Sequence, residues 1–134
     1  MNKYLFLFCL LINSVFANDF TGTYQCEGND GSEGAYQGEI IMKKIPEFSK
    51  DNYASYDFVL KVPGFGDYNG FASANGLDVA VYFALDDRKN EDYGVGIAKF
   101  KQSENQAWSF HKFYFEPGYK GGNTGFEDCV QVKK

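Results

Sequence analysis

Residues 55–85 read SYDFVLKVPGFGDYNGFASANGLDVAVYFAL, and this pattern favours three consecutive β-strands. Over residues 55–62, apolar side chains alternate with mainly polar ones, as in a strand that buries one face. Pro63-Gly64 marks a turn, and Asn75-Gly76 is a strong hairpin signal because both residues tolerate positive φ. The stretch therefore predicts strands at residues 55–62, 68–74 and 77–85.

The same alternation extends toward both ends of the chain, and no window has a helical period of useful length. It predicts further strands at residues 20–27, 36–43, 93–100, 107–116 and 126–132. Eight sequential strands with short connections favour an all-β fold, an eight-stranded antiparallel up-and-down barrel. A β-sandwich of two four-stranded sheets is the alternative.

The first 17 residues have the pattern of a secretory signal peptide. Lys3 is followed by an apolar run at residues 4–12, and Val15 and Ala17 are small residues suited to a cleavage site. A run of about nine apolar residues is too short to span a bilayer. We expect cleavage near Ala17, export to the periplasm or the cell exterior, and one domain at residues 18–134.

Two cysteines remain after that cleavage, Cys26 and Cys129. In an oxidising compartment an even count predicts a disulfide, and with two cysteines the pairing is forced. The bridge joins the first predicted strand to the last, as a barrel or a compact sandwich would allow. By the chain-entropy model, so long a loop contributes about 4–5 kcal/mol.

The charge of residues 18–134 argues against nucleic acid as a partner. Removing Lys3 leaves 12 basic residues against 18 acidic ones, a formal charge of −6. Phosphate-backbone binding depends on lysine and arginine, so neither nucleic acid nor an anionic membrane surface is expected. No later stretch is long and apolar enough to predict a membrane span.

The sequence offers little catalytic or metal-binding chemistry. His111 is the only histidine and the mature cysteines are expected to be oxidised, so a zinc site is not expected. Acidic loops at residues 29–33 and 86–92 do not fit the EF-hand pattern and are interpreted as solvated turns. Without a Gly-x-Ser-x-Gly motif, the best catalytic constellation is Glu116 with Glu127 on the following strand. We assign no catalytic residue, metal ligand or cofactor.

Aromatic residues are the most informative feature, with 14 phenylalanines, 10 tyrosines and one tryptophan. Such side chains fill small cores and also line ligand cavities. The predicted strand at 107–116 is aromatic on both faces, so Phe113 and Phe115 are expected to form a partner surface outside. The remaining candidates are expected to form the inner wall and bind a ligand: Tyr56, Phe58, Phe83, Trp108, Phe110 and Tyr114. Phe126 is also expected in that wall.

The segment Phe20-Thr21-Gly22-Thr23-Tyr24 resembles the first strand of the avidin and lipocalin barrels, where a Gly-x-Trp lies at the barrel floor. The resemblance implies an up-and-down barrel. Tyr24 stands where tryptophan is expected and Trp108 is the only tryptophan, so biotin binding is not carried over. The spacing Gly22-x-Tyr24-x-Cys26 and the ending Gly125, Glu127, Cys129 are also similar to small exported bacterial proteins of unknown function.

Three functions are consistent with these patterns. The first is a secreted, non-enzymatic binding protein for a small apolar or aromatic ligand or for a protein partner. The second is an acidic inhibitor of a secreted hydrolase, acting through charge complementarity. The third is a hydrolase that uses Glu116 and Glu127. The oligomeric state is left open.

Overall fold

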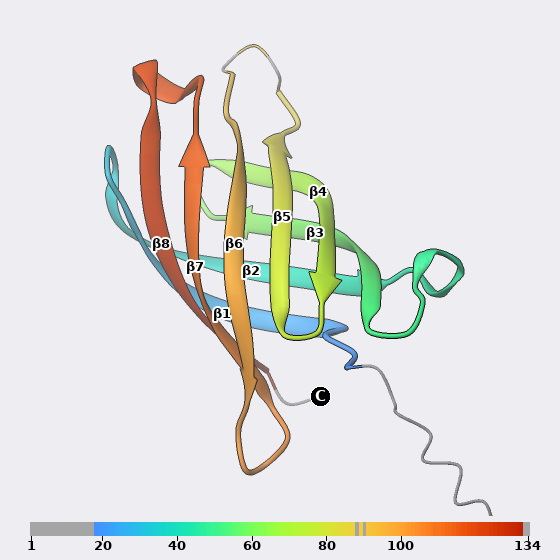
Figure 1. The fold of residues 1–134 in the computed structure, drawn as a ribbon. Coiled ribbons are helices and arrows are strands. Elements are labelled where there is room, and N and C mark those ends of the chain that lie inside the picture. The colour runs from blue at the N-terminus through green and yellow to red at the C-terminus, as the bar shows by residue number, and fades with distance from the viewer. Residues whose placement is uncertain (1–17, 88, 90, 133–134) are drawn as a thin grey trace, which may run out of the picture.

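The computed structural model describes residues 18–132 except residues 88 and 90, and they form a closed antiparallel β-barrel (Figure 1). Eight strands follow one another in chain order, and the first also pairs with the last. The predicted up-and-down barrel is confirmed, and the sandwich alternative is wrong. The strands are β1 (Gly22–Asp30), β2 (Gly34–Lys44), β3 (Tyr53–Val62), β4 (Gly66–Asn75), β5 (Asp78–Leu85), β6 (Tyr93–Gln102), β7 (Trp108–Glu116) and β8 (Asn123–Gln131).

Two connections differ from their predicted positions. Residues 28–34 were expected to form a loop, but β1 continues to Asp30 because Gly28 pairs with both Tyr36 and Glu127. At the β4–β5 hairpin Asn75 pairs with Asp78, so the two-residue turn lies one position later than predicted. Gly76 supplies its positive φ of 60°. Ladder pairing with neighbouring strands therefore sets both boundaries.

The predicted disulfide lies across the strand pair that closes the barrel. Cys26 and Cys129 face each other across the β1–β8 pair, with their Cα atoms 4.1 Å apart, and are bonded to each other. Both residues are buried. Because every strand then has two neighbours, no strand edge is left open for pairing with another chain.

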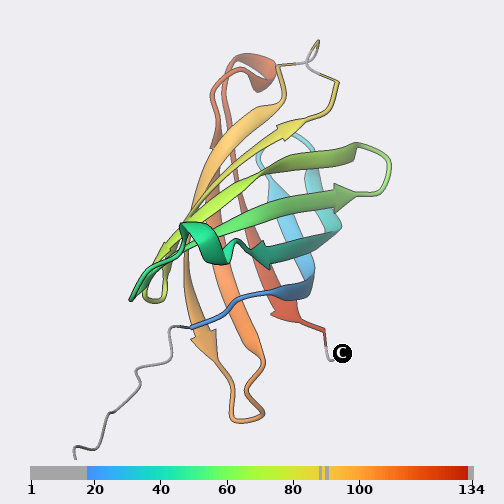
Figure 2. The same cartoon turned by 90° about the vertical axis from the view of Figure 1, so that its right-hand side faces the viewer.

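One end of the barrel is filled by aromatic side chains, and we call this cluster the floor. The segment before β1 runs across this end (Figure 2) and inserts Phe20. The Phe20 ring centroid lies 4.3 Å from that of Phe100. The Tyr24 hydroxyl donates to the Phe20 carbonyl at 2.7 Å, and the Phe20 N–H donates to the Tyr56 hydroxyl at 3.1 Å. The floor comprises Phe20, Tyr24, Tyr56, Phe100, Trp108 and Phe110.

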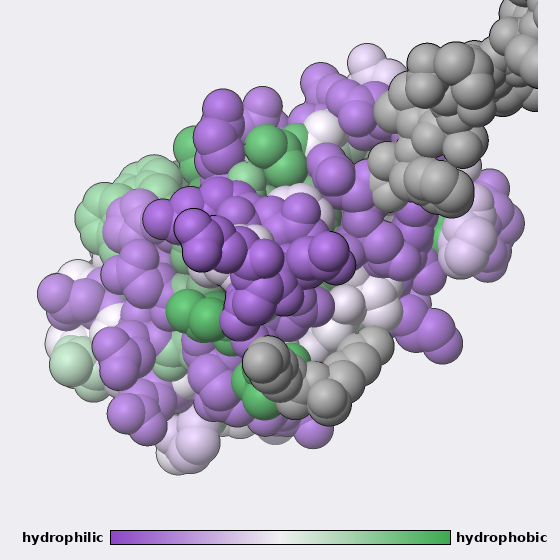
Figure 3. Space-filling view, turned by 90° about the horizontal axis from the view of Figure 1, so that it is seen from below, coloured by the Kyte–Doolittle hydropathy of each residue, from purple (hydrophilic) through white to green (hydrophobic). Residues whose placement is uncertain are grey.

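Short 3-10 helices lie at Pro46–Phe48 (η1) and Tyr119–Gly121 (η3). Within the described residues, no helix has the length and apolar character needed to cross a membrane. Seen from below, the molecule presents mostly hydrophilic residues with scattered hydrophobic ones (Figure 3). The predicted signal peptide, residues 1–17, lies outside the described residues.

Candidate ligand-binding site

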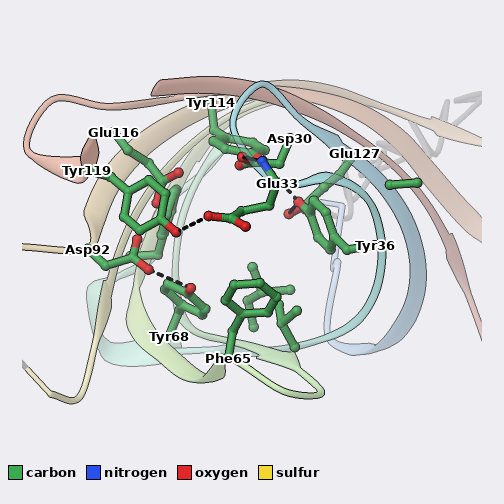
Figure 4. A pocket seen from close by; sticks show the side chains of 14 residues that line it. Asp30, Glu33, Tyr36, Phe65, Tyr68, Asp92, Tyr114, Glu116, Tyr119 and Glu127 are labelled. Carbon is green, nitrogen blue, oxygen red and sulfur yellow. Dashed lines mark hydrogen bonds between the residues drawn. The ribbon is translucent and has the colours of Figure 1, made fainter. Parts of the chain in front are cut away.

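A pocket opens at the end of the barrel opposite the floor (Figure 4), and we call it the mouth pocket. Its cavity volume is about 70 Å³. On this measure one water needs about 10–15 Å³, so the pocket accommodates roughly five waters or a ligand of that size. Its lining residues are Asp30, Glu33, Ala35, Tyr36, Leu60, Val62, Phe65, Tyr68, Phe83, Asp92, Tyr114, Glu116, Tyr119 and Glu127.

A fully buried ion pair lies at the base of this pocket. Lys112 and Glu127 are directly opposite each other on β7 and β8, and Lys112 Nζ is 2.8 Å from Glu127 Oε2. The two side chains are 0% and 1% exposed. Among the described residues no acceptor makes a hydrogen bond of good geometry with this Nζ. Instead it lies 5.2, 5.3 and 5.8 Å from the ring centroids of Phe58, Phe83 and Tyr114, within the range of cation–π attraction.

Two tyrosines continue a polar network from the ion pair toward the mouth. The Tyr36 hydroxyl donates to Glu127 Oε1 at 2.5 Å, and the Tyr114 hydroxyl donates to Asp30 Oδ2 at 2.6 Å. Burial alone would raise the pKa of Asp30, but hydrogen bonds from Tyr114, from Asn123 and from backbone N–H groups together lower it. Burial and the Glu127 carboxylate raise the pKa of Tyr36. The Asp30 carboxylate therefore has its hydrogen-bond partners within the protein. The Tyr36 hydroxyl stays protonated and acts as a hydrogen-bond donor.

Glycines opposite these tyrosines make the room for their rings. Gly28 faces Tyr36 across β1–β2, and Gly125 faces Tyr114 across β7–β8. A Cβ on Gly28 would lie 2.2 Å from the Tyr36 ring, and one on Gly125 would lie 2.1 Å from the Tyr114 hydroxyl oxygen. The pocket wall thus depends on residues without a side chain at these two positions.

A second group of polar side chains occupies the other side of the pocket, where Asp92, Tyr68 and Glu116 approach one another (Figure 4). The Tyr68 hydroxyl donates to Asp92 Oδ2 at 2.7 Å, and Asn123 Nδ2 donates to Glu116 Oε1 at 2.8 Å. Asp92 Oδ1 is buried and has no hydrogen-bond partner among the described residues. Asp92 therefore has a further side-chain donor only when Glu116 is protonated.

Glu116 differs chemically from the other carboxyl groups. Burial and the neighbouring Asp92 raise its pKa from 4.5 to about 8, against the opposing hydrogen bond from Asn123. Between about pH 4.5 and 8, the folded protein therefore keeps a proton that the unfolded chain has lost. Consequently this group lowers the free energy of unfolding as pH rises through that range, and it has no such effect at lower pH.

A polar bridge crosses the rim of the pocket. Glu33, in the turn after β1, accepts from the Tyr119 hydroxyl at 2.6 Å and from Lys120 Nζ at 2.5 Å. These hydrogen bonds lower the pKa of Glu33. The β1–β2 turn is thereby linked to η3.

The six residues expected to bind a ligand all point into the barrel, but only two line the mouth pocket. Phe83 and Tyr114 do so. Phe58 lies deeper, against the Lys112 ammonium. Tyr56, Trp108 and Phe110 belong to the floor, so for these three the structure shows packing rather than a pocket wall.

The predicted partner-surface residues Phe113 and Phe115 lie outside the barrel, 38% and 43% exposed. The expectation for Phe126 was wrong, because it is 48% exposed on the same outer surface. Cys129 points inward, so alternation places Glu127 and Gly125 inside and Phe126 outside. His111 is also exposed and contacts Asp128 at 2.7 Å.

Sequence reasoning missed most of the polar residues of the pocket. Lys112 has the same parity as Phe110 and Tyr114, which were placed inside, so alternation was the signal that could have identified it. Tyr36 and Tyr68 were detectable in the same way from their own strands. Asp92, at the end of a polar loop, carried no such signal. Glu116 and Glu127, the predicted carboxylate pair, do line one pocket, although Glu127 is held by Lys112.

One group of metal-type ligand atoms occurs among the described residues, formed by Cys26, Glu127 and Cys129. The two sulfur atoms are bonded to each other, so they are not thiolates available to a metal. No protein-family model matches the sequence, and no curated protein matches it at a significant level.

Proposed function

We propose that the protein is an exported, non-enzymatic binding protein that holds a small ligand in the mouth pocket. The observation that carries this proposal is the division of the barrel interior into a filled floor and a hollow, open mouth. Ligand sites in proteins are concave and largely apolar, with a few well-placed polar groups. The mouth pocket is concave and combines apolar residues such as Leu60, Val62 and Phe83 with a larger set of hydroxyl and carboxyl groups.

The polar groups around the pocket are held in place before any ligand arrives. Tyr36, Tyr68 and Tyr114 each donate to a buried or half-buried carboxylate. Hydrogen-bonded side chains on strands lose less conformational freedom on binding than mobile ones, which favours affinity. Export is supported by the residue 1–17 pattern together with a disulfide, since disulfides persist in oxidising compartments.

The test is NMR titration of the disulfide-bonded protein with a fragment library that contains cationic, neutral and anionic compounds. We expect at least one charge class to shift the signals of pocket residues such as Tyr36, Tyr68 and Ala35. Signals of Phe71 and Ile97, on the outer surface, serve as the internal control. A library in which no compound perturbs the pocket, or in which binders perturb only the outer surface, contradicts the proposal.

A second binding surface is the outer apolar face, which we define as the exposed side chains Phe71, Tyr82, Val95, Ile97, Phe113, Phe115 and Phe126. Two rows of directly paired residues build it across β4–β8, with no charged residue in either row. At about 200 Å² for a large side chain, their exposed fractions amount to roughly 700 Å². The largest patches on monomers reach about 300–600 Å², and a stable interface takes about 800 Å² per partner.

For this face we propose a second copy of the chain as the occupant, since two uncharged, self-complementary sheets pack face to face without unpaired charges. We expect sedimentation velocity to show a dimer at tens of micromolar, and Ile97→Lys to give a monomer. Gln37→Lys, on the polar outer side of β2, is the control and should remain dimeric. A wild-type protein that stays monomeric at high concentration contradicts this assignment.

A further inference from the structure

We infer that the ligand of the mouth pocket is a small protonated amine, whose ammonium group binds between Asp92 and Glu116 while its apolar part contacts the pocket wall. This inference rests on the proposed ligand-binding function and specifies the chemical class of the ligand. Geometry supports it through one unsatisfied oxygen, the balance of charges in the pocket, and an ammonium that the barrel already holds.

The unsatisfied oxygen is Asp92 Oδ1. Asp92 is 6% exposed, and only its Oδ2 accepts a hydrogen bond, from Tyr68. Asp92 lines the pocket, and its buried Oδ1 has no donor among the described residues when Glu116 is ionised. A buried acceptor without a partner is costly, and more so when it is charged. A ligand that brings donors to this position replaces the single donor that a protonated Glu116 supplies.

The charges around the pocket leave the carboxyl groups of Asp92 and Glu116 without a basic partner among the described residues. Lys112 lies against Glu127, Lys120 bridges to Glu33, and Asp30 is saturated with hydrogen bonds. Among the described lining residues, Asp92 and Glu116 are the acidic residues that remain with neither a basic partner nor such a set of hydrogen bonds. A carboxylate ligand would meet two like-charged groups here, and an alcohol would bring one donor. An ammonium group brings three donors and a compensating charge.

Lys112 shows that this barrel can hold such a group. Its ammonium lies 2.8 Å from a carboxylate oxygen and 5.2 to 5.8 Å from three aromatic rings, fully buried. The Asp92 side of the pocket offers a similar combination, with the rings of Tyr68 and Tyr119 beside the carboxyl groups (Figure 4). Aromatic faces attract cations most strongly where water is excluded.

In the free protein a proton on Glu116 relieves the repulsion between the two carboxyl groups, consistent with its raised pKa. Binding replaces that proton: protonated Glu116 and an alkylammonium ion give the carboxylate–ammonium pair, and one proton leaves to solvent. The other titratable groups near this position are Tyr68 on β4, Tyr119 in η3 and Asp30 on β1. None of these three groups titrates between pH 6 and 8, because the pKa values of both tyrosines are raised and the pKa of Asp30 is lowered.

The experiment compares n-butylamine, 1-butanol and butyrate, which match the pocket in size, by NMR titration of the disulfide-bonded protein at pH 8. We expect the amine to bind at least about tenfold more tightly than the alcohol, equivalent to about 1.4 kcal/mol, and butyrate to bind least. Asp92→Asn should weaken amine binding about tenfold and leave 1-butanol within twofold. Asp57→Asn, an exposed acidic residue of β3, is the matched control and should change neither.

A second measurement uses the released proton. Lowering the pH from 8 to 6 should weaken amine binding by about fiftyfold in all, because the proton must be displaced, and should not affect 1-butanol. Glu116→Gln, which keeps the side-chain shape, should abolish this pH dependence.

Equal affinity for the amine and the alcohol, or amine binding that survives Asp92→Asn unchanged, overturns the assigned ligand class. Either result leaves the proposed ligand-binding function intact, because the alcohol still occupies the pocket. If none of the three compounds shifts any pocket signal at millimolar concentration, the ligand class fails, and the proposed function fails as well only if the fragment library also leaves the pocket signals unchanged.

Discussion

Replacing Lys112 by methionine lowers the free energy of unfolding by about 3–5 kcal/mol, the usual result of removing one partner of a buried ion pair. The variant keeps the volume of the side chain but leaves the Glu127 carboxylate buried without its cation, with only Tyr36 as a hydrogen-bond donor. Urea unfolding at pH 7 measures the loss.

Two further variants separate the ion pair from simple packing. Lys112→Met with Glu127→Gln removes both charges, so it should recover most of the stability lost in the single variant. Lys99→Met is the matched control, because Lys99 pairs with Asp78 at 3.5 Å on the surface and both side chains are largely exposed. Its cost should be less than about 1 kcal/mol. A double variant as unstable as Lys112→Met would contradict the role assigned to the charge.

Removing the Cys26–Cys129 bridge lowers the free energy of unfolding by about 4–5 kcal/mol by the chain-entropy model. The bridge spans 103 residues, so its loss frees almost the whole barrel sequence in the unfolded state. We expect this result for wild-type protein under reducing conditions, measured by urea unfolding against the oxidised form. The Cys26→Ala/Cys129→Ala variant should lose slightly more, because it also removes two buried sulfur atoms.

Reductant added to the Cys26→Ala/Cys129→Ala variant is the control and should have no effect on its unfolding. A loss below about 1 kcal/mol on reduction would show that residual structure already holds the chain ends together without the bridge.

The architecture was predictable because a strand requires only an alternation that is visible over a few residues. The sequence 55–85 contains two hairpins with turn dipeptides, and the same period recurs in every other strand. The strand count favoured closure, whereas cysteines in the first and last predicted strands were compatible with either a barrel or a sandwich. Alternation identifies which residues share a face, but it does not say which face is inside when both are aromatic, as around Phe113 and Tyr114.

Two misplaced side chains show the limit of the hydrophobicity rule. Phe126 was expected inside because it is aromatic, and Lys112 was passed over because it is charged, yet the barrel places them the other way round. Apolar residues are often exposed, while a buried lysine requires a partner that sequence alone does not reveal. Here that partner is Glu127 on the next strand.

The pocket itself depends on relations between distant strands. Tyr68, Asp92 and Glu116 come from β4, the segment before β6, and β7, and no local pattern connects them. Their meeting depends on the register of each intervening strand pair around the barrel. A carboxylate pair on adjacent strands, such as Glu116 and Glu127, was within reach of a hairpin argument, whereas a contact across the interior was not.

The pairing of β1 with β8 has a consequence for the order in which the chain can fold. β1 is synthesised first and its second neighbour last, so residues 22–30 expose one unpaired edge until residue 131 is available. A growing chain can therefore build the hairpins from β1 to β7 but cannot close the cylinder. The fold can therefore be completed only after β8 has been synthesised, and the incomplete sheet is the state in which the chain is most open to pairing with a neighbour.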